Sequence, residues 1–202
     1  MKTVLELDHR KAIQAINFFA RKEGGKIDKL KVIKLIWLAD RRHLRKYGRP
    51  IINDTYYAME YGPVGSSIKD FTSFNMLTKN TETDYLSKYL KQNNNNKIES
   101  INEPNMDVFS DSDINTLETV YNEYGKLNGF KLVEISHEYP EWKKFKKVLE
   151  SKSSTREVMN YKDFFLNPKK TSEKKVLQDD EKTLSNSKKI FEENFQLASY
   201  WI

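Results

Sequence analysis

Apolar residues recur at helical spacing over most of the first half of the chain. Between Asp8, a candidate N-cap, and about residue 23 they mark one amphipathic helix. A second helix is predicted over 29–46, with Asp28 able to cap its start and Gly48 placed to end it. Its apolar residues cover nearly the whole circumference, which is typical of a buried central helix.

After the second helix the pattern changes from helical spacing to alternation. Residues 55–61 alternate and are rich in β-formers, so a strand is predicted there, with Gly62 and Pro63 ending it. Shorter strands are expected near 98–101 and 108–109. Apolar spacing and N-cap residues predict further helices near 66–74, 85–91, 110–125, 130–138, 143–150 and 160–166. The helix near 110–125 has the clearest start, because residues 110–113 (Ser-Asp-Ser-Asp) have capping-box-like spacing. The fold class that follows is mainly α, of the α+β type: a helical domain with a small antiparallel β-sheet or hairpin.

The C-terminal part of the chain has a different composition. Residues 169–182 are charged and nearly free of apolar side chains, which predicts a linker. Beyond them, Ile190 and Phe191 belong to a pattern typical of an amphipathic helix. We therefore predict a helical domain over 1–167, and a linker with a C-terminal amphipathic helix over 168–202.

Composition limits the compartment and the partners. The chain of 202 residues contains no cysteine, which is compatible with a reducing cytoplasm. Charged residues interrupt the apolar stretch at the start, and the longest apolar run is too short to span a bilayer. A soluble cytoplasmic protein with no membrane partner is expected. The net charge of +6 is a small excess over a surface of mixed sign, so nucleic acid is disfavoured as a partner.

Candidate chemistry is limited to a few side chains. Asp40 and His43 share one face of the second helix through their i,i+3 spacing, and His137 with Glu138 could complete an acid–base or metal cluster. In the alternative interpretation, Asp40 pairs with a neighbouring arginine and His43 is a hydrogen-bonded histidine near the core. We favour the alternative, and therefore expect no enzymatic activity, no metal and no cofactor.

The strand region is rich in tyrosine. Such side chains suit either a protein interface or the core of a small half-buried sheet. One face of the strand is expected to be core and the other, including Tyr56 and Glu60 beside Tyr61, to be accessible. Gly62 and Pro63 are expected to serve the turn first and direct contact second.

Lysines are concentrated at 143–147, next to Trp142 and Phe145. A basic stripe with interleaved aromatic residues could bind nucleic acid. More often such a stripe is a solvated helix face whose aromatic residues point inward. We favour the solvated face.

Several short blocks of sequence occur together in a fixed order. They are KLIWLADRRHL at 34–44, YGRP at 47–50, AMEYGPV at 58–64 and LVEISHE at 132–138, the last followed by Pro140 and Trp142. In content, order and spacing these blocks resemble the Panacea domain, which is also met in phage-associated proteins. The resemblance covers roughly residues 8–166.

This resemblance implies an antitoxin. Panacea domains are found beside toxin genes in bacterial and prophage loci, neutralise protein toxins by binding them, and are not known for catalysis. The implied partner is a cognate protein toxin whose active site is occluded. If that toxin acts on RNA, a local carboxylate patch could mimic nucleic acid, and the candidate segments are 99–113 and 179–193.

Some residues are assigned to partner binding or to holding the motif scaffold. They are Lys34, Asp40, His43, Arg49, Tyr56, Glu60, Tyr61, Gly62, Pro63, His137 and Trp142. Two alternatives stay open: a phage or prophage regulator or adaptor that binds a host factor, and a nucleic-acid-binding regulator. A homo-oligomer also stays open.

Overall fold

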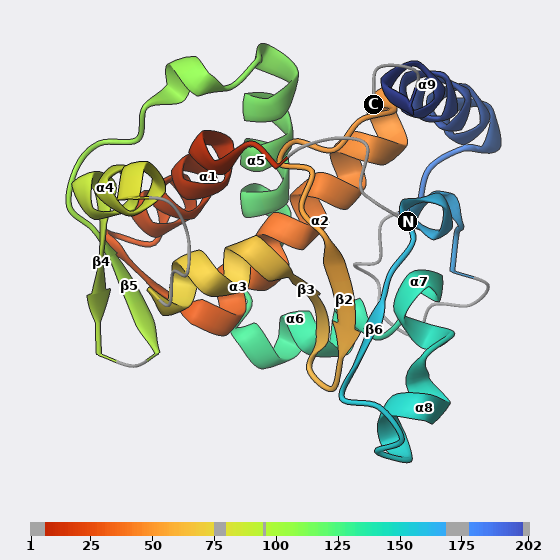
Figure 1. The fold of residues 1–202 in the computed structure, drawn as a ribbon, viewed down its shortest axis with the longest axis horizontal. Coiled ribbons are helices and arrows are strands. Elements are labelled where there is room, and N and C mark those ends of the chain that lie inside the picture. The colour runs from red at the N-terminus through yellow and green to blue at the C-terminus, as the bar shows by residue number, and fades with distance from the viewer. Residues whose placement is uncertain (1–6, 75–79, 95, 169–177, 200–202) are drawn as a thin grey trace.

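The computed structural model describes residues 7–74, 80–94, 96–168 and 178–199, and Figure 1 shows their arrangement. In these ranges the α-helices are α1 (His9–Lys22), α2 (Lys29–Tyr47), α3 (Ser66–Ser73), α4 (Asn80–Tyr89), α5 (Asp111–Tyr124), α6 (Gly129–Ser136), α7 (Pro140–Lys143), α8 (Lys146–Glu150) and α9 (Glu181–Ser199). The 3-10 helices are η1 (Met106–Val108) and η2 (Tyr161–Phe165). The strands are β1 (Lys26–Asp28), β2 (Tyr56–Met59), β3 (Gly62–Gly65), β4 (Leu90–Asn93), β5 (Lys97–Ser100) and β6 (Arg156–Val158).

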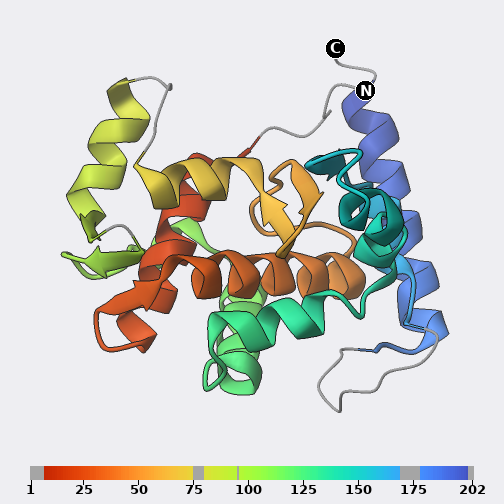
Figure 2. The ribbon, with the colours of Figure 1, turned by 90° about the horizontal axis from the view of Figure 1, so that it is seen from below.

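Helix α2 is the central element, and Figure 2 shows it lengthwise with segments from both halves of the chain around it. Its apolar side chains are buried on all sides, including the large Trp37 at 0 % exposure. At its start the Asp28 carboxylate accepts a hydrogen bond from the Lys31 amide at 3.0 Å. At its end Gly48, with φ of 72°, donates its amide to the Leu44 carbonyl at 2.8 Å. The predicted helix and both of its caps are confirmed.

Two small antiparallel sheets flank the helices in the described residues. One has the strand order β3-β2-β6 and the other β1-β5-β4. In the first sheet Tyr57 of β2 lies opposite Val64 of β3 and Val158 of β6. In the second, Ile27 lies opposite Ile98, and both side chains are buried. Together with the helices, these sheets confirm the predicted mainly α class with a small antiparallel sheet.

Several local predictions differ from the structure. The strand predicted over 55–61 ends at Met59, and Gly62 and Pro63 belong to the next strand, β3. The helix expected over 143–150 is divided between α7 and α8.

The strand expected at 108–109 is wrong, because Met106–Val108 form η1, which the Asn105 side chain caps by accepting from the Asp107 amide at 3.1 Å. The helix expected over 85–91 begins earlier and ends at Tyr89, since the next residues pair as β4 with β5. The Asn105 cap fixes the first segment and pairing with β5 fixes the second, and apolar spacing along the sequence indicates neither contact.

Helix α9, in the C-terminal part of the chain, packs against α2. Leu184 and Phe191 are 8 % and 5 % exposed and face the protein, whereas Leu197 is 60 % exposed. The contact is close at Gly48, where a Cβ atom would lie 2.7 Å from the Ser187 carbonyl oxygen. Of the predicted linker, residues 169–177 lie outside the described residues. The predicted division of the chain after residue 167 stays a prediction.

None of the helices in the described ranges has the length and apolar content needed to cross a bilayer. Helix α2 has buried basic side chains instead, namely Lys31, Lys34, Arg41 and Arg45. These buried charges lead to the candidate site.

Candidate functional site

Asp40 closes the loop that follows α2. Its carboxylate, at 0 % exposure, accepts hydrogen bonds from the Ile51 amide at 2.9 Å and the Ile52 amide at 3.0 Å. The other carboxylate oxygen accepts from the Tyr56 hydroxyl at 3.0 Å. Burial raises the pKa of Asp40 to about 7, because desolvation of the charged form outweighs these three hydrogen bonds. The expected pairing of Asp40 with an arginine is wrong: its side chain faces the loop backbone.

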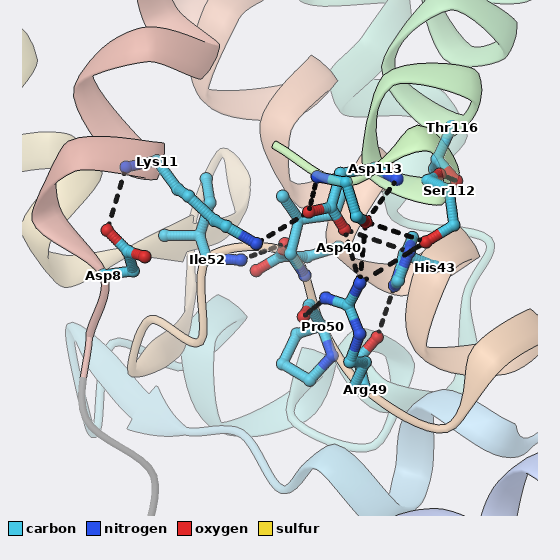
Figure 3. A network of polar contacts seen from close by, with 12 residues as sticks. Asp8, Lys11, Asp40, His43, Arg49, Pro50, Ile52, Ser112, Asp113 and Thr116 are labelled. Atoms are coloured by element: carbon cyan, nitrogen blue, oxygen red, sulfur yellow. Dashed lines mark hydrogen bonds and ion pairs between the residues drawn. The ribbon is translucent and has the colours of Figure 1, made fainter. Parts of the chain in front are cut away.

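His43 lies one turn further along α2 in the polar network of Figure 3. Its Nδ1 atom is 2.7 Å from the Arg49 carbonyl, which can only accept, so Nδ1 carries the proton. Its Nε2 atom is 3.0 Å from the Ser112 hydroxyl and 3.1 Å from the Asp113 carboxylate. Burial lowers the pKa of His43 to about 4, so the ring is neutral at pH 7. His43 is therefore the hydrogen-bonded core histidine that we expected, and its carboxylate neighbour is Asp113 rather than Asp40.

Asp113 is the anion at the centre of this network. It is 0 % exposed and lies 2.6 Å from the Lys11 ammonium and 3.0 Å from the Arg49 guanidinium. Burial raises its pKa, but the Lys11 hydrogen bond, the Ser110 amide and the Arg49 charge together hold the pKa below its usual value. In this way Asp113 joins α1, α5 and the end of α2. The sequence pointed to Asp113 only as the third residue of a capping box, which the structure also contains.

Tyr56 was predicted to be accessible, and this is wrong. It is 2 % exposed, and its ring centroid lies 5.7 Å from that of Phe164. Alternation in β2 places Tyr56 and Ala58 toward the core and Tyr57 toward the other face. The alternation was predicted correctly, but the face was reversed because Tyr161 and Phe164 of η2 pack against the Tyr56 ring. Glu60, at the turn after β2, is exposed as expected.

Lys34 forms a second buried cluster at the turn between β2 and β3. Its ammonium nitrogen, at 0 % exposure, donates to the Pro63 carbonyl at 2.6 Å, and burial lowers its pKa to about 7. Gly62 has φ of 86°, and a Cβ atom there would collide with the Ser136 hydroxyl. Gly62 is therefore required both by its backbone conformation and by the close approach of α6.

His137 and Trp142 pack beside the same β2–β3 turn. The two rings stack with centroids 3.5 Å apart and planes 9° apart, and the Trp142 indole donates to the Met59 carbonyl at 2.9 Å. Burial, with the nearby Lys34 charge, lowers the pKa of His137 to about 4. The turn that these residues hold leaves Tyr61 55 % exposed.

The residues considered for catalysis therefore fall into separate clusters. Asp40 and His43 face the loop after α2 and the start of α5, whereas His137 lies against Trp142 and the β2–β3 turn. In the described ranges no group of three or more histidine, aspartate or glutamate side chains is placed to hold a metal ion. The sequence suggested one site because spacing along the chain does not reveal which cluster each side chain joins.

Arg41 forms a buried ion pair that the sequence did not reveal. Its Nε atom lies 2.6 Å from the Glu141 carboxylate, and both side chains are 0 % exposed. The guanidinium also lies over the Tyr139 ring, 4.1 Å from its centroid, and donates to the Leu166 carbonyl at 3.0 Å. These contacts join α2 to α7 and to the segment after η2.

Arg45, one turn after Arg41 on α2, makes a similar set of contacts to a carboxylate and to backbone carbonyls. Its guanidinium donates to the Asp179 carboxylate at 2.6 Å and to the carbonyls of Phe164 at 2.8 Å and Leu166 at 3.1 Å. Arg41 and Arg45 thus attach the C-terminal segments to α2. The arginines were visible in the sequence, but their partners lie too far along the chain for a local pattern to indicate them.

The lysine stripe at 143–147 is largely paired with carboxylates. Lys143 lies 3.0 Å from Glu138, Lys144 contacts Asp163, and Lys146 lies 3.6 Å from Glu150. Trp142 is 4 % exposed and Phe145 packs against the core, so the aromatic residues point inward as we favoured. This arrangement is typical of a solvated helix face rather than of a nucleic-acid interface.

These observations define a mainly helical protein whose sequence motifs form buried polar clusters around one central helix. Residues 32–143, from α2 to α7, match the family model described as antitoxin SocA-like, Panacea domain. The match covers more than half of the chain, which therefore belongs to this family of antitoxin-like proteins. Comparisons with curated proteins and with solved structures found no match.

Proposed function

We propose that this protein is the antitoxin of a toxin–antitoxin system and neutralises a cognate protein toxin by binding it directly and covering its active site. The observation that carries the proposal is membership of the antitoxin-like Panacea family over residues 32–143. In this proposal the protein acts in the cytoplasm of a bacterium, from a chromosomal or prophage gene. It needs no cofactor and no catalytic step.

Burial of the motif residues supports the view that they stabilise the fold, while exposed residues contact the partner. Lys34, Asp40 and His43 are each 0 % exposed, so a toxin cannot touch them while the protein stays folded. They hold in place the elements whose outer surfaces a partner can reach, such as the β2–β3 turn with Glu60 and Tyr61. The motif then supplies a rigid scaffold, and the exposed side chains decide which toxin is bound.

Binding without catalysis agrees with the state of the buried ionisable groups. The rings of His43 and His137 are neutral at pH 7 because burial lowers the pKa of both. One ring is held between Arg49 and Ser112 and the other is stacked on Trp142. A general base needs a nitrogen within reach of a substrate. Both nitrogens of His43 are hydrogen-bonded, and the Nε2 atom of His137 has no hydrogen-bond partner but is buried, so these positions favour a structural role.

Internal pairing of carboxylates favours occlusion over mimicry of nucleic acid. In segment 99–113, Glu99 lies 3.4 Å from Lys26 and 3.3 Å from Lys91, and Asp113 is buried. In segment 179–193, Asp179 is paired with an arginine of α2. These carboxylates are not available to mimic a phosphate backbone, so such mimicry would rest on the remaining exposed carboxylates of the two segments, such as Asp107 and Asp111.

Co-expression with the products of neighbouring genes tests the proposal. Each product is expressed alone and together with this protein in the same bacterial host, and growth and co-purification are measured. We expect one product to stop growth alone, to lose its toxicity in the presence of this protein, and to co-purify with it. The antitoxin function fails if no product is toxic, or if growth is restored without a complex between the two purified proteins.

A further inference from the structure

An open groove of about 720 Å³ lies where the start of α2 meets the connection between α5 and α6. The two helix starts are close, since a Cβ atom on Gly129 would lie 3.2 Å from both Asp28 and Leu30. Figures 1 and 2 both show α6 running alongside α2, with the β4–β5 hairpin near the same end. Asn96, from the connection between those two strands, completes the rim.

The groove is lined by apolar side chains that are incompletely covered. Leu30 and Leu127 are half-buried and Phe130 is 67 % exposed, whereas Ile33, also in the lining, is buried. Phe130 is the most exposed of the large apolar side chains in the described residues. Apolar surface next to a concave site is the usual location of an anchor residue from a protein partner.

Basic groups surround this apolar lining. Lys126 is exposed. The Lys29 ammonium donates a hydrogen bond to the Ser73 hydroxyl at 3.3 Å and not to a carboxylate. Within the described ranges neither ammonium group lies within an ion-pair distance of an acidic side chain. The one acidic residue of the lining, Asp28, already accepts the hydrogen bond that caps α2. The groove is therefore complementary to a partner with both apolar and acidic side chains.

We propose that this groove docks a segment of the cognate toxin in which an apolar side chain is flanked by carboxylates. The apolar side chain packs beside Phe130, and the carboxylates pair with Lys29 and Lys126. The proposal rests on the proposed antitoxin function and adds the surface that recognises the toxin. It also explains why the motif clusters need not contact the partner, since the groove lies at the other end of α2 from His43 and Arg49.

A polypeptide suits the groove better than a nucleic acid does. A phosphate backbone is bound by a row of unpaired cations. Of the three lysines in this lining, Lys31 is already paired with Glu23, and the lining also contains apolar side chains and Asp28. Charged groups at the rim and an apolar anchor in the centre are the usual anatomy of a protein interface. A second copy of this chain and a single-stranded RNA are the competing occupants that the experiment has to exclude.

The experiment uses the full chain and, as its probe, the neighbouring-gene product that stops growth in the co-expression test. Phe130→Asp and Lys126→Glu alter the groove, and Leu197→Asp and Lys147→Glu are matched controls. Leu197 is 60 % exposed on α9, and Lys147 is an exposed lysine with no carboxylate at ion-pair distance in the described residues. We expect each groove variant to weaken toxin binding at least tenfold and to lose neutralisation, while both controls bind like the wild type.

A labelling experiment locates the contact directly. The chain has no native cysteine, so Asn96→Cys at the groove rim and Ser185→Cys on α9 each accept a single photo-crosslinker. We expect the toxin to crosslink to the first and not to the second. A 20-nucleotide single-stranded RNA should not compete, and light scattering should give the same molar mass for Phe130→Asp as for the wild type.

The outcomes separate the two proposals. If wild-type protein neutralises the toxin and the groove variants do so equally well, the groove proposal is overturned and the antitoxin function stands. Equal losses in groove and control variants, displacement by RNA, or a dimer that Phe130→Asp dissociates would also overturn it. If the wild-type protein does not bind the toxin at all, the antitoxin function itself fails. Circular dichroism of each variant distinguishes loss of contact from loss of fold.

Discussion

Replacing the buried Asp40 by asparagine should change how stability depends on pH. In the folded protein the pKa of Asp40 is about 7, against an ordinary value of 3.8. Because the folded state holds this proton more tightly than the unfolded chain does, the contribution of Asp40 to stability is greatest at low pH. It decreases as the pH rises from about 4 to about 7. Asparagine has no such proton and should not show this decrease.

The size of the effect follows from the two pKa values. A difference of about three pH units, at 1.36 kcal/mol per unit, corresponds to roughly 4 kcal/mol of unfolding free energy. The asparagine carbonyl can still accept from the Ile51 and Ile52 amides, and its amide can donate to the Tyr56 oxygen. Asp40→Asn should therefore be close to the wild type in stability near pH 4 and more stable than the wild type near pH 8.

Urea denaturation followed by circular dichroism measures this difference at several pH values. Taking the difference between wild type and Asp40→Asn cancels the titration of groups that do not interact with Asp40. Asp54 is the exception, because its charge raises the pKa of Asp40. The variant Asp70→Asn, at an exposed position of α3, is the matched control and should track the wild type. A difference between wild type and Asp40→Asn that stays constant from about pH 4 to about pH 8 would refute the reasoning.

Three further substitutions test other contacts. Glu141→Ala leaves the Arg41 guanidinium buried without its carboxylate and should lower the unfolding free energy by about 3–5 kcal/mol, measured in urea; a loss below about 1 kcal/mol contradicts the buried pair. Gly48→Ala adds a Cβ at φ of 72° and 2.7 Å from the Ser187 carbonyl, so we expect a loss of about 1–3 kcal/mol and faster proteolytic release of α9. Trp142→Phe removes the hydrogen bond to β2 and should cost about 1 kcal/mol in thermal unfolding, whereas unchanged stability would show that the bond contributes nothing.

Helix boundaries could be predicted well because the signals that set them are local. The Asp28 cap and the Gly48 stop act within one turn of the residues they define. The capping box from Ser110 to Asp113 likewise begins α5 where the sequence places it. The family resemblance was also visible in contiguous blocks of residues, and the family match confirms it.

Side-chain partners could not be predicted where they lie far apart in sequence. His43 meets Ser112 across 69 positions, and Arg45 meets Asp179 across 134. Local periodicity carries no information at such separations, so Asp113 was interpreted as a cap and missed as the centre of a network. The reversed face of Tyr56 has a similar cause, because alternation gives two faces but does not say which one η2 covers.

The pairing of Arg45 with Asp179 also has a consequence for synthesis on the ribosome. Arg45 leaves the exit tunnel 134 residues ahead of its carboxylate partner. At roughly 5–20 residues per second, the nascent chain carries this arginine without its partner for about 7–27 s. The carbonyls of Phe164 and Leu166 arrive shortly before Asp179 does. Final docking of the C-terminal segments on α2 is therefore a late event, and a newly made chain completes its fold only after most of it has been translated.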